Sequence, residues 1–172
     1  LGGNLLEKAY RSCKRNEINV CAVNSQDSSE VIEKGSVHDR LNYLQNSLDS
    51  KLERKGYSVE MDGDNVMVVY KDGENPVYFL NSQTVTSKEG VETLVVGRND
   101  VKNGQSLEET LEGVARREDS IVIAEHPLTE SHAGMGEENL RKYASKIDAV
   151  EGHNSQLIFR LLGKLPLFRQ YA

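Results

Sequence analysis

The segment IVIAEHPLTE, residues 121–130, decides the fold that the sequence predicts, together with IDAVEGHNS at residues 147–155. Residues 121–124 are consecutive apolar residues, which is typical of a short strand buried on both faces in a parallel sheet. A helix over 137–146 and a second strand over 147–150 would complete a β–α–β unit. Because parallel strands end at the same edge of a sheet, both are expected to deliver polar side chains to one rim.

Helical spacing and turn signals predict the remaining elements. Helices are predicted over residues 5–15, 37–55 and 106–117, and strands over 20–23, 57–61, 66–70, 77–80 and 91–96. Gly56 ends the long second helix, and the strands on either side of MDGDN form a hairpin. Ser106 and Glu109 form a capping box that opens the helix before residue 121.

The order of these elements predicts the fold class. Helices and strands alternate over most of the chain, which indicates an α/β fold, either a layered sheet or a barrel, with right-handed crossovers. The helix and hairpin at residues 28–76 interrupt this order as an insertion. A chain of 172 residues accommodates one core, so we expect a single domain over residues 1–172.

Composition limits the function classes. A net charge of -6 argues against a protein that binds a nucleic-acid backbone. The sequence has no apolar run as long as a membrane span, so we expect a soluble protein of the cytoplasm that does not bind membranes. Its two cysteines, Cys13 and Cys21, lack metal-site spacing and are expected to be thiols in a reducing compartment.

The histidines are the main candidates for chemistry. His126 precedes a proline at a strand end, where a fixed backbone can hold an imidazole toward a pocket; the alternative is a rim histidine satisfied by hydrogen bonds. His132 lies in a glycine-containing loop and His153 beyond the next strand end. A hydrolytic metal site normally needs three or more converging ligands. The sequence contains no GxxxxGK[ST], GxGxxG, GxSxG or HExxH motif.

Four segments resemble, in the same order, motifs of the polymerase and histidinol phosphatase (PHP) family of metal-dependent phosphoesterases. They are NLLEKAYRSCKRNEINVCAV at 4–23, QTVTSKEGVETLVVG at 83–97, SLEETLEGVARREDSIVIAEHP at 106–127 and IDAVEGHN at 147–154. The third ends in the HP motif of that family, and the fourth in its acidic-x-x-Asn segment. The resemblance implies an incomplete or distorted PHP-like β/α barrel, with a helix and hairpin insertion and a metal cluster at the carboxyl ends of the strands.

The resemblance assigns a role to His126, which matches the metal-ligand histidine of the HP motif. Glu151 and Asn154 match the acidic residue and the asparagine of the last motif. His132 and His153 are further candidate ligands. The metal implied by the family would be zinc, manganese or iron.

Other family positions differ. Where the family has Thr-Asp-His followed by Asp or Asn, this chain reads Asn24, Ser25, Gln26 and Asp27, so a glutamine replaces a ligand histidine and Asp27 stays a candidate ligand. The ligand glutamate is replaced by Thr84, or by its neighbour Gln83 if the register shifts by one residue. An amide or a hydroxyl is a poor substitute for an anionic or imidazole ligand.

These substitutions favour a PHP-like domain with a degenerate metal site and a structural or binding role. The alternative is an active metal-dependent phosphoric-ester hydrolase with altered ligands. Either reading allows a phosphate-ester ligand. The first HxH pair of the family would lie before Leu1 and its closing Asp-x-His pair after Ala172, which raises the alternative that the chain is a fragment.

A third hypothesis is independent of the resemblance. The helix over 37–55 and the hairpin after it form an insertion larger than a connection needs, and such additions often cover a site or make an interface. This reading predicts a protein partner or a homo-oligomer.

Overall fold

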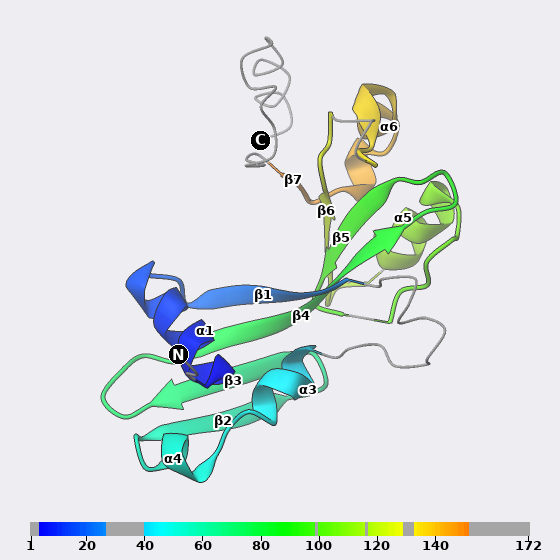
Figure 1. Cartoon of the computed structure of the whole chain (residues 1–172). Coiled ribbons are helices and arrows are strands. Elements are labelled where there is room, and N and C mark those ends of the chain that lie inside the picture. Colours follow the sequence, from blue (N-terminus) through cyan, green and yellow to red (C-terminus); the bar gives the residue numbers. More distant parts are fainter. Residues whose placement is uncertain (1–3, 27–39, 99, 116, 129–132, 152–172) are drawn as a thin grey trace. The chain divides into compact units, whose positions relative to one another are not determined.

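The computed structural model of the chain describes residues 4–26, 40–98, 100–115, 117–128 and 133–151 (Figure 1). Its contacts divide the chain into two compact units. The first unit comprises Leu1–Gln83 with Gly97–Asn99, and the second comprises Thr84–Val96 with Asp100–Ala172. Each unit has its own cluster of buried apolar side chains.

The first unit contains three helices and four strands among its described residues. They are α1 (Leu5–Arg15), β1 (Val20–Gln26), α3 (Arg40–Gln45), α4 (Ser50–Glu53), β2 (Tyr57–Asp62), β3 (Val66–Lys71) and the part of β4 (Val77–Thr86) up to Gln83. β2, β3 and β4 pair antiparallel in chain order, and β1 pairs with β4. The predicted hairpin is therefore confirmed.

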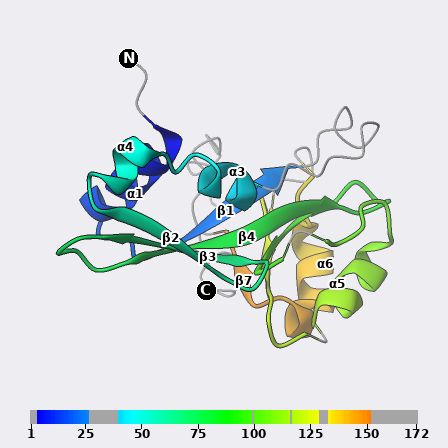
Figure 2. The same ribbon diagram turned by 90° about the horizontal axis from the view of Figure 1, so that it is seen from below.

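The helices of the first unit cover one face of its strands. Figure 2 shows α1, α3 and α4 on the same side of β2 and β3. Leu6 and Tyr10 of α1 pack with Leu41, Leu52 and Phe79 in this core, and each of these side chains is at most 1% exposed. The spacing of the apolar residues in α1 directs one face of the helix toward the sheet, as the sequence predicted.

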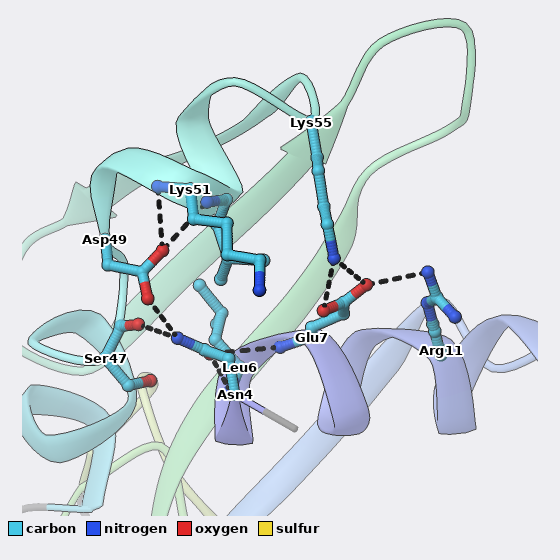
Figure 3. Close-up of polar contacts among 9 residues, drawn as sticks. Asn4, Leu6, Glu7, Arg11, Ser47, Asp49, Lys51 and Lys55 are labelled. Carbon is cyan, nitrogen blue, oxygen red and sulfur yellow. Dashed lines mark hydrogen bonds and ion pairs between the residues drawn. The ribbon is translucent and has the colours of Figure 1, made fainter. Parts of the chain in front are cut away.

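The single long helix predicted over residues 37–55 is wrong for the residues that the structure describes. α3 ends at Gln45, and Asp49 starts α4 by accepting hydrogen bonds from the main chain of Lys51 and Leu52 at 3.0 and 2.8 Å (Figure 3). An aspartate at this position stabilises a new helix start more than a continuing helix. α4 ends at Glu53, two residues before the predicted end at Lys55, and Gly56, with φ of +80°, ends the turn that follows the helix.

The same region holds the start of α1. The side-chain oxygen of Asn4 caps the helix by accepting from the main chain of Leu6 at 3.0 Å, and its amide nitrogen donates to the carbonyl of Ser47 (Figure 3). Asn4 thus joins the start of α1 to the turn before α4.

The second unit contains strands and helices in a different arrangement. Its described elements are the end of β4, β5 (Glu92–Val96), α5 (Leu107–Ala115), β6 (Ile121–Ala124), α6 (Gly136–Lys142), the 3-10 helix η2 (Ala144–Lys146) and β7 (Ala149–Val150). β5 pairs antiparallel with β6, and β6 pairs parallel with β7. The capping box is confirmed, because Glu109 accepts from the main chain and hydroxyl of Ser106 at 2.9 and 2.7 Å.

Strand β6 is buried on one face only. Val122 and Ala124 are at most 1% exposed, whereas Ile121 is 48% exposed and Ile123 is half-buried. The predicted burial on both faces is therefore wrong. Four apolar residues in a row conceal the alternation that the strand shows in the structure, where α5 packs against it.

The predicted PHP-like β/α barrel is contradicted by the strand order. The described strands form a mixed, mostly antiparallel sheet in the order β2-β3-β4-β5-β6-β7, with β1 paired to β4. Of the pairings with a recorded register, β6 with β7 is the parallel one. Short turns such as the one at Gly63 return the chain antiparallel, whereas a β/α barrel needs a helical crossover between successive strands.

Candidate functional site

The candidate site lies at the carboxyl end of the parallel pair β6 and β7. Ala124 is opposite Val150 in the register, so both strands end together, and the next residues are Glu125 and His126 on one strand and Glu151 on the other. The main chain of Glu151 donates to the carbonyl of Ala124 at 3.0 Å. The parallel pairing that the sequence predicted for these strands is confirmed.

Strand β7 has only two residues, and acidic side chains support it at both ends. Asp148 accepts from the main chain of Val122 at 2.8 Å and returns a main-chain hydrogen bond to the carbonyl of Val122 at 2.9 Å. At the other end, Glu151 accepts from the main chain of His126 at 2.9 Å. These carboxylates extend a pairing that so short a strand could not provide alone.

Glu151 also fixes the ring of His126. The ring Nδ1 lies 2.9 Å from Glu151 Oε2, the same oxygen that accepts from the main chain of His126. A carboxylate only accepts hydrogen bonds, so this contact assigns a proton to Nδ1, and a neutral ring then carries its lone pair on Nε2. The two side chains are 24% and 29% exposed, which places the contact at a partly solvated surface.

The backbone at His126 has an unusual conformation. Its φ is +45°, in the left-handed region, and the next residue, Pro127, accepts from the main chain of Gly136 at 2.9 Å at the start of α6. This turn directs both the main-chain N–H and the ring of His126 toward Glu151. A non-glycine residue with this φ is uncommon, so the surrounding contacts must hold it.

Glu125 belongs to this group but was not among the candidates that the sequence pointed to. It is half-buried, and burial raises the pKa of its carboxyl group, with further raising by the charges of Glu92 and Glu151. A hydrogen bond with the side chain of Thr84 and the charge of His126 oppose that pKa shift. Its Oε2 is buried without a hydrogen-bond partner among the described residues. Its position directly before His126 is the sequence feature that could have identified it as a candidate.

The structure places the other candidates as follows. Thr84 and Gln83 are neighbours in β4 and both are buried, with Thr84 in the second unit and Gln83 in the first. Asn24 is half-buried in β1, and Gln26 is the last residue of that strand. Four candidates lie outside the described residues: Asp27, His132, His153 and Asn154.

The described residues supply only some of the ligands that a metal cluster requires. Glu151 contacts Nδ1 of His126, and the carboxylate of Glu125, the preceding residue, belongs to the same group. Within the described ranges, no group of three or more histidine, cysteine, aspartate or glutamate side chains is arranged to hold a metal ion. The metal site therefore remains a prediction.

Comparison of the chain with protein-family models, with curated proteins and with solved structures finds no match. Of the helices that the structure describes, none is long and apolar enough to cross a membrane.

Proposed function

We propose that the chain is a binding domain related to the metal-dependent phosphoesterases of the PHP family, with a degenerate metal site around His126. One observation carries the proposal, the 2.9 Å contact between His126 Nδ1 and Glu151 Oε2. These residues are 25 positions apart and stand in the two segments that resemble the HP and acidic-x-x-Asn motifs of the family. The proposed relation concerns these motifs and not a barrel.

The chemistry of the group favours a cation as the ligand. Two other carboxylates act electrostatically on Glu125, since the charges of Glu92 and Glu151 raise the pKa of its carboxyl group. A divalent cation would relieve this repulsion, whereas a free phosphate would add to it. We infer that the group binds one zinc, manganese or iron ion weakly, and that a phosphate ester would bind through that ion.

A binding role is favoured over hydrolysis by the contacts of Thr84. This threonine stands at the position of a ligand glutamate of the family, and its buried side chain shares a hydrogen bond with Glu125. A neutral hydroxyl engaged in that way supplies no negative charge to a multinuclear centre. The proposed site therefore retains an oriented histidine and one carboxylate.

Active hydrolysis is the second candidate, because Glu151 orients His126 as a carboxylate orients a catalytic general base. In this alternative the chain is a metal-dependent phosphoric-ester hydrolase with altered ligands. We also propose a cytoplasmic location, which the free thiols of Cys13 and Cys21 support.

Metal titration and hydrolysis assays separate the two functions. Purified chain would be analysed for bound metal, titrated with Mn²⁺ by calorimetry and assayed with p-nitrophenyl phosphate, with and without chelator. We expect weak binding of one ion, reduced in Glu125→Gln but unchanged in Glu118→Gln, a matched change at an exposed glutamate. A stoichiometric multinuclear centre, or chelator-sensitive hydrolysis that His126→Ala abolishes, would overturn the binding role.

A further inference from the structure

The first unit contains a pocket of about 610 Å³ beside α1. Small-molecule sites commonly have volumes of roughly 300–1,000 Å³. Five basic side chains line it: Lys8, Arg11, Lys14, Arg15 and Lys71. Its lining includes a single carboxylate, that of Glu74. The pocket is therefore strongly positive in a chain whose net charge is -6.

The periodicity of α1 explains this concentration of charge. Lys8, Arg11 and Arg15 follow one another at three- and four-residue intervals, so they lie along one side of the helix. Leu6 and Cys13, which pack into the core, lie on another side, and Tyr10 contacts both the core and the pocket. The basic residues of α1 thus line the pocket while its apolar residues pack into the core.

Nearby carboxylates offset only part of the positive charge. Glu74 contacts Lys71, and its Oε2 lies 3.4 Å from the hydroxyl oxygen of Tyr10. Arg11 pairs with Glu7 at 2.7 Å, and Glu7 is shared with Lys55 at 3.0 Å (Figure 3).

The other basic side chains that line the pocket remain positively charged. Lys14 donates to the carbonyl of Asn75 at 3.3 Å, a neutral acceptor that leaves the ammonium charge in place. In the described part of the chain, neither Lys8 nor Arg15 has an ion-pair partner, and both are exposed.

Tyr57 supplies an independent sign of a ligand. It lines the pocket and is 3% exposed, and its hydroxyl oxygen is buried without a hydrogen bond of normal geometry among the described residues. The neighbouring Arg11 guanidinium interacts with this oxygen as a donor, and that interaction is the largest of the influences that raise the pKa of Arg11. Because arginine only donates, the proton of the hydroxyl still lacks an acceptor among the described residues, and an oxygen atom of a ligand would supply one.

We propose that this pocket binds a small molecule that carries two or more phosphate groups, as a nucleoside diphosphate does. Lys8, Lys14 and Arg15 contact the phosphate oxygens, and the hydroxyl of Tyr57 donates to one of them. The ring of Tyr57 packs edge-on against Tyr10 with centroids 5.4 Å apart, and both are buried, so neither offers an open face for stacking nucleic-acid bases. The bounded volume and the missing stacking face favour a small molecule over a nucleic-acid strand.

Calorimetric titration of the whole chain tests the proposal. The probes are ADP, inorganic pyrophosphate, inorganic phosphate and a short single-stranded oligonucleotide, all at physiological salt and without added divalent metal. We expect ADP and pyrophosphate to bind more tightly than inorganic phosphate. The variant Lys8→Glu/Arg15→Glu should weaken binding at least about tenfold, since two charge-assisted contacts are lost. The control Lys102→Glu/Arg117→Glu makes the same charge change at exposed residues outside the lining and should leave affinity within about twofold.

Two further variants test the contact of the Tyr57 hydroxyl and the independence of the pocket from His126. Tyr57→Phe keeps the ring and the charges, so a several-fold loss of ADP affinity would support the hydroxyl contact, and an unchanged affinity would refute it. His126→Ala should bind ADP like the parent chain, because this inference does not depend on the proposed metal site. The proposal is overturned if the two charge-reversal pairs weaken binding equally, if no phosphate probe binds, or if the oligonucleotide binds more tightly than ADP. Circular dichroism would verify that each variant is folded.

Discussion

The left-handed backbone at His126 makes a prediction that can be tested by stability measurements. With φ of +45°, any residue other than glycine is strained at this position. We therefore expect His126→Gly to be more stable than His126→Ala by about 1 kcal/mol. At an ordinary loop position the order is reversed, because glycine gains more entropy on unfolding.

The contacts of Glu151 determine the other contributions to the free energy of unfolding of these variants. Both variants lose the ring contact at 2.9 Å, which we value at about 1 kcal/mol, since it is charge-assisted but about a quarter exposed. Both retain the main-chain hydrogen bond from residue 126 to Glu151, so this term cancels. The Ala variant should then lie about 1 kcal/mol below the parent chain, and the Gly variant close to it.

Urea unfolding followed by circular dichroism, extrapolated to water, gives the free energies of unfolding. Glu118, in an exposed turn with an ordinary backbone, provides the control pair Glu118→Gly and Glu118→Ala, of which the Ala variant should be at least as stable. If Ala equals or exceeds Gly at position 126 while the control pair behaves normally, the left-handed turn at this position is refuted.

Three other predictions concern buried groups. Glu125→Gln should increase stability at pH 7, because burial raises the pKa of Glu125 and the fold disfavours its charged form; the gain should disappear on acidification below the usual glutamate pKa of about 4.3, measured by unfolding at several pH values. Leu52→Ala and Leu111→Ala, one in each core, should each cost about 3 kcal/mol in chemical unfolding, and a cost below about 1 kcal/mol would contradict their burial. Burial raises the pKa of Cys13 to about 11, so iodoacetamide at pH 8 should label it far more slowly in the folded chain than in urea, as followed by mass spectrometry; equal rates would exclude a buried thiol.

Local signals in the sequence predicted local structure well. The helix over Leu5–Arg15 and the strand over Ile121–Ala124 have the predicted bounds, and the capping box at Ser106 is present. These elements depend on apolar spacing and on side chains within a few residues of one another. The same reasoning placed His126 and Glu151 together, because a β–α–β unit brings successive strand ends to one edge.

Non-local pairing explains what the sequence did not predict. The polar residues after position 80 were not assigned to a strand, yet β4 continues to Thr86 and buries Asn81, whose side chain donates to the Asp64 carbonyl and to Asn65 at 3.2 Å. Partners in a distant turn satisfy this amide, and no periodicity reveals them. The contact between Thr84 and Glu125 joins two strands in the same way.

The support of β7 by carboxylates has a consequence for how relatives of this chain could be recognised. Asp148 and Glu151 each hold a specific main-chain N–H of β6, at Val122 and at His126. Inserting or deleting one residue between the two acids would separate one of them from its main-chain partner. The number of residues between the acids is therefore constrained more strictly than the identity of the apolar residues at those positions. A search for distant relatives should therefore weight this acid-to-acid spacing, and the matching spacing on β6, above the identity of the residues between them.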